Sequence, residues 1–140
     1  MSFSGNIGAL RGFEQSLRRL ADVPAKVAEK GAEAIAEQID QQFASGTDAY
    51  GNAWAPHAPA TVARWGEHPI LELTGALRGE VDVHPLPGTG IAIELGELAS
   101  LHQSGTSRMP ARPILPSGTF PAAWREALEQ AAAESFEEAR

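Results

Sequence analysis

The sequence has no cysteine among its 140 residues, which excludes disulfide bonds and any chemistry that depends on a thiolate. Basic residues are also few, because 11 Lys and Arg stand against 18 Asp and Glu and give a formal net charge of −7. A protein whose main task is to grip nucleic-acid phosphates usually carries a basic face, and this composition does not supply one. We therefore expect no sequence-specific binding of nucleic acid.

Long apolar runs are missing as well. No window approaches the roughly 18 apolar residues that a membrane-spanning helix needs, and residues 1–13 lack the charged start and apolar run of a signal peptide. We expect a soluble protein made in the cytoplasm, without membrane contact. A chain of 140 residues is the length of a single domain with one modest core, so we expect one domain over residues 1–140.

Signatures of catalysis and of metal binding are also lacking. The 4 histidines are far apart in the sequence and show no histidine spacing typical of metal ligands. The glycine-rich stretch at residues 88–90 is not a phosphate-binding loop, and no G-x-S-x-G motif is present. We expect no metal and no cofactor. A small hydrolase whose site is assembled from dispersed residues remains an alternative.

Three stretches have the spacing of amphipathic helices. Over residues 7–20, apolar side chains recur every three or four positions and would gather on one face. The same spacing predicts a helix over residues 24–43, with Pro24 in its first turn, where proline is tolerated. Gly31 in its interior favours close packing against a neighbour. A third helix is expected at the C-terminus, over residues 121–138.

The pattern between these helices is that of strands. Polar and apolar residues alternate over residues 80–84, a proline–glycine turn follows, and residues 91–96 repeat the alternation, which predicts an antiparallel hairpin. Residues 98–103 and 112–115 are candidates for further strand segments. The order predicts an α+β fold with two N-terminal helices, a small antiparallel sheet with a hairpin, and a C-terminal helix packed on it.

Two long loops separate these elements. The first, at about residues 44–70, is rich in Gly and Pro but carries Tyr50 and Trp54, and residues 59–64 favour a short helix within it. Aromatic side chains in a turn-rich segment usually dock it onto a core or onto a partner. We expect Trp54 to anchor this loop. The second loop lies at about residues 103–118.

The second loop holds an arginine between two prolines, and two interpretations of it are open. In the first, the segment is an internal lock in which Arg112 pairs with an acid of its own chain. In the second, flexible residues 104–107 reach out and Arg112 clamps a carboxylate on an adjacent subunit, because its planar fork of donors suits a carboxylate. With Tyr50 and Trp54, the residues that we expect to take part in an interaction are His102, Gln103, Pro110, Arg112 and Pro113.

Four sequence blocks occur in a fixed order: FASGTDAYGNAWAP (residues 43–56), APAT (58–61), ILELTGALR (70–78), and LHQSG followed by PARPIL (101–115). Together they resemble the tail completion, or virion morphogenesis, proteins of tailed bacteriophages and prophages, of the type found in phage Mu. The resemblance covers about residues 25–116. Each block alone is a weak signal, whereas four blocks in this order, ending in Pro-Ala-Arg-Pro, are a more specific one.

The resemblance implies a non-enzymatic structural subunit at the head–tail junction, in the virion neck or tail, made in the cytoplasm of a host bacterium. Its expected partners are further copies of itself in a ring, for which a hexamer is the leading expectation, and the neighbouring tail or neck proteins. A regulatory binding domain of a bacterial operon is the remaining alternative, beside the hydrolase.

Overall fold

The computed structural model describes residues 21–66, 76–86 and 90–139. The elements of this part of the chain follow one another in the order α2 (Val23–Ser45), α3 (Pro59–Trp65), α4 (Ala76–Gly79), β1 (Val81–Leu86), β2 (Gly90–Leu95), α5 (Glu97–Ser104) and α6 (Ala122–Ala139). Helices combined with a two-stranded antiparallel sheet make this an α+β fold, as the sequence predicts. The helix expected over residues 7–20 lies outside the described residues.

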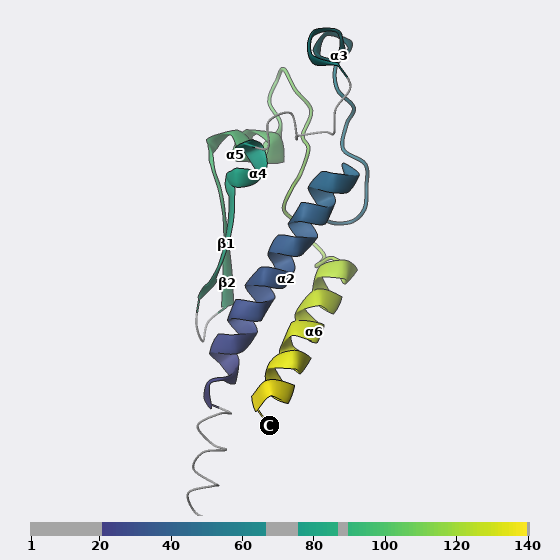
Figure 1. Ribbon diagram of the computed structural model, residues 1–140. Coiled ribbons are helices and arrows are strands. Elements are labelled where there is room, and N and C mark those ends of the chain that lie inside the picture. Colours follow the sequence, from purple (N-terminus) through teal and green to yellow (C-terminus); the bar gives the residue numbers. More distant parts are fainter. Residues whose placement is uncertain (1–20, 67–75, 87–89, 140) are drawn as a thin grey trace, which may run out of the picture.

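The two long helices, α2 and α6, lie side by side and run in opposite directions (Figure 1). They match the predicted helices over residues 24–43 and 121–138 to within two residues at each end. α2 ends at Ser45 and is capped by Gly46, whose backbone is left-handed at φ 70° and ψ 33°, a conformation that glycine adopts without a steric cost. Near the other end of α2, Lys30 donates to the carboxylate of Glu138 on α6 at 2.6 Å and ties the two helices together.

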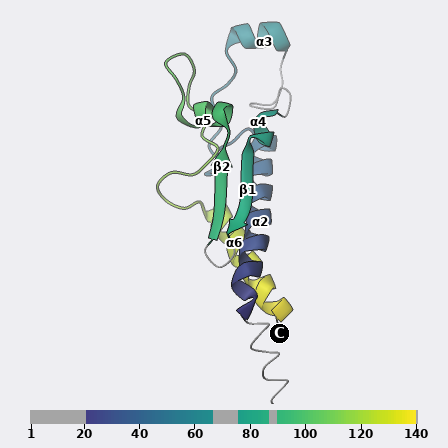
Figure 2. The same ribbon diagram turned by 90° about the vertical axis from the view of Figure 1, so that its left-hand side faces the viewer.

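The predicted hairpin is formed by β1 and β2, with Val81 opposite Leu95 and Leu86 opposite Gly90. It packs along α2, which lies between the hairpin and α6 in Figure 1; Figure 2 gives the view onto the hairpin. The sequence predicts that the C-terminal helix packs on the sheet. In the structure α6 packs chiefly on α2.

Gly31 lies where these three elements meet. A Cβ atom at this position would stand 2.7 Å from Cδ1 of Ile91 on β2 and 3.1 Å from Cδ2 of Leu128 on α6. The absence of a side chain therefore lets both neighbours approach the backbone of α2. The close packing expected at Gly31 is confirmed.

The core joins residues from nearly every described element, including loops. Its buried members are Ile35, Ile39, Phe43, Ala49, Trp54, Leu77, Val81, Ala99, Ile114 and Trp124. Three of them, Ala49, Trp54 and Ile114, come from irregular segments, so these segments are part of the core and not simply connections.

One predicted strand is wrong, because residues 98–103 belong to helix α5 (Glu97–Ser104). Only Ala99 is fully buried in this helix, so the alternating burial of a half-buried strand does not occur. The helix start is stabilised from outside, since the carboxylate of Glu80 accepts a hydrogen bond from the Ala99 amide at 3.0 Å. An acceptor 19 positions away in the sequence satisfies one of the first-turn donors.

The second tentative strand, residues 112–115, is not part of any strand of the described structure. The short helix favoured over residues 59–64 is present as α3. Within the described ranges, no helix combines the length and the apolar character that crossing a bilayer requires.

Candidate functional site

The segment of residues 112–115, named the inner segment below, is held by side chains instead of by a neighbouring strand. The carboxamide of Gln103 makes three of its bonds. Oε1 accepts from the amides of Ile114 (2.7 Å) and Leu115 (2.8 Å), and Nε2 donates to the carbonyl of Leu115 at 3.0 Å. A single side chain on α5 thus supplies the pairing that a strand would otherwise give.

Two further carbonyls of the inner segment accept hydrogen bonds from α2 and from the first loop. Nε2 of Gln42 donates to the carbonyl of Ile114 at 2.8 Å, and Oε1 of Gln42 accepts from Nε1 of Trp124 at 3.1 Å. Nε1 of Trp54 donates to the carbonyl of Pro113 at 2.7 Å. Because Ile114 and Gln42 are buried, these bonds satisfy polar groups that water does not reach.

Arg112 is the most unusual member of this segment, because only 8% of it is exposed. Its Nε donates to the carbonyl of Ala55 (2.8 Å) and its Nη2 to the carbonyl of Pro56 (2.9 Å), while its own amide donates to the carbonyl of His102 (2.7 Å). Burial lowers the pKa of the guanidinium, which nevertheless remains charged at neutral pH. Arg112 therefore fastens the first loop to the second.

This arrangement corrects both interpretations of Arg112. The internal lock exists, but the partners of the guanidinium are two backbone carbonyls and not an acid of the chain. A clamp on the carboxylate of a neighbouring subunit would require donors at the surface, whereas this side chain is buried and its fork is directed at the first loop. The sequence pattern alone does not distinguish an acidic partner from a backbone carbonyl, because every residue carries a carbonyl group.

Residues 104–107, expected to form a flexible reach, include a glycine that lies close to the other limb of the loop. Gly105 has φ 74° and ψ 171°, a region that is essentially restricted to glycine, and a Cβ there would lie 2.7 Å from the amide nitrogen of Ala111. Thr106 and Met109 form a small bridge just beyond it. The absence of a side chain at Gly105 therefore lets the two limbs of the loop approach each other closely. Of the flanking prolines, Pro110 is exposed and Pro113 is half-buried.

The first loop is anchored by Trp54, as the sequence predicts. Trp54 is 5% exposed, and its ring meets that of Phe43 edge to face, with centroids 5.4 Å apart. Tyr50 remains 42% exposed, and its hydroxyl lies within hydrogen-bond distance of the carbonyls of Ser117 (2.7 Å) and Thr119. Both aromatic side chains thus connect the first loop to the chain that leads into α6.

His102 lies beside this network but does not take part in it through Nδ1, which is buried and has no hydrogen-bond partner within the described residues. Burial lowers the pKa of His102, the charge of Arg112 lowers it further, and Glu80 raises it. A hydrolase of the Ser-His-Asp type needs an acid that orients the imidazole through this nitrogen. The hydrolase alternative therefore gains no support from His102.

An apolar groove of about 720 Å³ lies between α2, β2 and α6. Two exposed aromatic rings border it, with Phe120 at 43% and Phe136 at 55% exposure. The groove exists because α6 packs on α2 and leaves part of β2 uncovered. Sequence patterns do not indicate this groove, because its wall combines residues of three elements: Val23, Pro24, Val27, Ala28, Ile35, Gly90, Ile91, Ile93, Phe120, Trp124, Leu128, Ala132 and Phe136.

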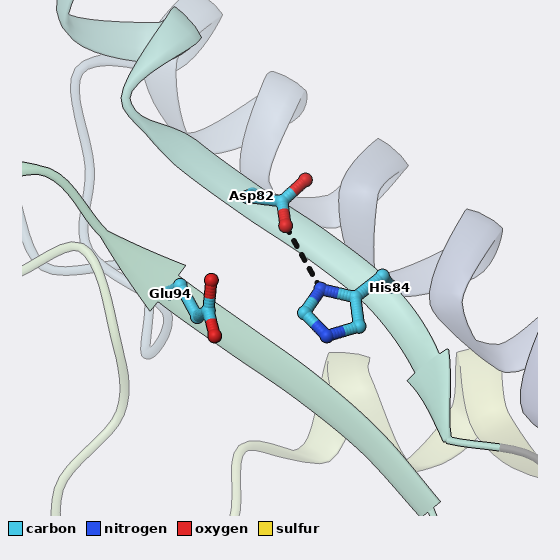
Figure 3. A group of neighbouring side chains, drawn as sticks. All are labelled: Asp82, His84 and Glu94. Carbon is cyan, nitrogen blue, oxygen red and sulfur yellow. Dashed lines mark hydrogen bonds and ion pairs between the residues drawn. The ribbon is translucent and has the colours of Figure 1, made fainter.

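A polar cluster on the hairpin was missed as well. Asp82, His84 and Glu94 each offer a nitrogen or oxygen atom within 4.8 Å of the others. Figure 3 shows these side chains together on the two strands. Metal motifs in which the ligands follow one another along the chain do not include this arrangement. Asp-x-His within an alternating strand was the signal that could have indicated a shared face.

Replacing Arg112 with alanine should destabilise the isolated chain. The change removes two charge-assisted bonds and leaves the carbonyls of Ala55 and Pro56 without these donors, for an expected loss of about 2–3 kcal/mol. Urea unfolding measures it. Arg108→Ala is the matched control, because Arg108 is exposed in the same loop and should change stability by less than about 0.5 kcal/mol. Equal stability of the two variants would contradict the assigned role.

Replacing His102 with glutamine should make the chain less sensitive to acid. The pKa of His102 in the folded chain is lowered, so the unfolded chain binds the proton first as the pH falls. The stabilisation is complete above about pH 6.5 and decreases as the pH drops through that value toward the native pKa. Melting temperatures between about pH 7.5 and 5.5 should fall less steeply in the variant. Identical slopes in both chains would refute this.

Comparison with known proteins identifies no relative of this chain. No protein-family model matches the chain, and neither the curated proteins nor the solved structures contain a significant match to it. The resemblance to tail completion proteins therefore rests on the four sequence blocks, and the site is interpreted from its own contacts.

Proposed function

We propose that the chain is a non-enzymatic structural protein of a phage or prophage that acts at the head–tail junction. One observation carries this proposal: residues of the first and last blocks hold the inner segment and the first loop in place. Trp54 of the first block and Gln103 of the last bind the inner segment, and Arg112 of the last block binds the first loop. The resembling blocks thus include residues whose contacts hold the loops in place. Proteins that share an architecture are expected to share such residues.

The third block contributes to the same framework. Leu77 is a core residue, and Nε of Arg78 binds the carboxylate of Asp40 at 2.6 Å while Nη1 donates to the carbonyl of Val81 at 3.0 Å. Polar residues that catalyse usually project into a cleft, ready to meet a substrate. In these blocks Arg78, Gln103 and Arg112 bind their own chain instead, which supports a structural role.

A second copy of the chain is the partner that we propose for the apolar groove, within a ring of subunits. Phe120 and Phe136 border a hollow with an almost entirely apolar wall, and exposed apolar patches of this kind commonly mark protein–protein contacts. Aromatic rings are suitable anchors, because they bury a large area with few rotatable bonds. Neighbouring tail or neck proteins would meet the ring at its other surfaces.

The acidic composition is compatible with a place in the virion neck or tail. A formal net charge of −7 disfavours adhesion to passing DNA, because like charges repel. A subunit that borders the DNA passage without holding the polymer would benefit from this charge.

The test combines electron microscopy of particles with a substitution in the groove. Particles assembled without the protein should contain heads and tails that are not joined, and the wild-type chain should restore them. Phe136→Ser should restore them at least about tenfold less well, although the free energy of unfolding should change by less than about 0.5 kcal/mol, because the ring is exposed.

Leu98→Ser is the matched control, since Leu98 is also 55% exposed but lies on α5, outside the groove wall. It should restore particles as well as the wild type does. Normal particles in the absence of the protein would refute the proposed function. A large loss of stability in Phe136→Ser would show that the groove is covered within the chain and would refute the proposed contact alone.

A further inference from the structure

The outward face of the hairpin brings together three potential metal ligands. Asp82 and His84 are two positions apart on β1 and therefore project from the same face, and Glu94 on β2 stands directly opposite Asp82 (Figure 3). One ligand atom from each lies within 4.8 Å of the others, and Nδ1 of His84 is 2.8 Å from Oδ2 of Asp82. Atoms at such distances can reach a common ion.

The electrostatics of this face favour a cation. Carboxylates directly opposite each other on neighbouring strands repel, and Asp82 and Glu94 form such a pair. Within residues 21–66, 76–86 and 90–139, the ion pairs include no Lys or Arg bound to either carboxylate. An ion between the strands would convert this repulsion into attraction.

The hairpin also holds the ligands in place before an ion arrives. Val83 and Ile93, on the opposite face of the same strands, pack against the core, and His84 itself is half-buried. The register between β1 and β2 fixes the spacing of Asp82 and Glu94. A site on paired strands therefore loses less conformational freedom on binding than one on mobile loops.

We propose that Asp82, His84 and Glu94 form a binding site for a divalent transition-metal ion such as Zn²⁺. The imidazole distinguishes this cluster from an ordinary group of surface acids, because nitrogen together with carboxylate oxygen suits Zn²⁺, whereas Mg²⁺ and Ca²⁺ prefer oxygen ligands alone. The ion takes the place of the hydrogen bond between Nδ1 of His84 and Asp82. Water completes the coordination.

The ion would connect β1 to β2 and stabilise the folded chain, since a ligand that binds only the folded state raises its stability by mass action. This inference is independent of the proposed role in phage assembly and concerns the chain alone.

Isothermal titration of the chelator-treated full-length chain with ZnCl₂ at neutral pH tests the site. We expect saturable binding of one ion per chain. His84→Gln and Glu94→Gln should each weaken it at least about tenfold, because each removes a ligand. His57→Gln is the matched control, since it removes an imidazole located in the first loop, and it should bind as the wild type does. MgCl₂ should give no comparable binding. Circular dichroism verifies that every variant is folded.

Binding weakened to this extent in both His84→Gln and Glu94→Gln, with wild-type affinity in His57→Gln, supports the site. The absence of saturable Zn²⁺ binding by the wild type would overturn it. Wild-type affinity in either hairpin variant, or weakened binding in His57→Gln, would overturn it equally, because the ion would then be held elsewhere.

Discussion

The carboxamide of Gln103 bonds to the backbone of Ile114 and Leu115, and the arrangement of the loops depends on this contact. A chain segment that enters the core without a strand partner leaves amides and carbonyls that must still be paired. Gln103 satisfies three such groups, while Gln42 and Trp54 bind the carbonyls of Ile114 and Pro113. With these bonds made, Ile114 can be fully buried.

The inner segment then determines where the other parts lie. Arg112, two positions before Ile114, is buried with it and holds the first loop by donating to two of that loop's carbonyls. Trp124, near the start of α6, donates a hydrogen bond to Gln42 of α2. α6 consequently lies along α2, so that part of β2 remains uncovered and forms one wall of the apolar groove. The interior contacts of the loops and the proposed assembly surface are thus two results of one packing arrangement.

Local patterns were sufficient to predict the parts of the fold that local physics governs. Apolar spacing predicted α2 and α6, alternation predicted the hairpin, and an aromatic residue in a turn-rich stretch indicated the burial of Trp54. The failures all involve distant partners. α5 was missed because its first turn is stabilised by Glu80, and the partners of Arg112 are carbonyls without a sequence signature. Asp82 and Glu94 meet only through the strand register. The phage role came from resemblance and remains a proposal.

Amide hydrogen exchange at Ile114 and Leu115 tests the central claim most directly. In the wild-type chain both amides should exchange nearly as slowly as that of Ile39 in the buried part of α2. In Gln103→Ala their exchange should accelerate at least about 100-fold, while Ile39 remains protected to a greater extent. Rapid exchange of Ile114 and Leu115 in the wild type, or unchanged exchange in the variant, would show that the Gln103 carboxamide does not hold the inner segment.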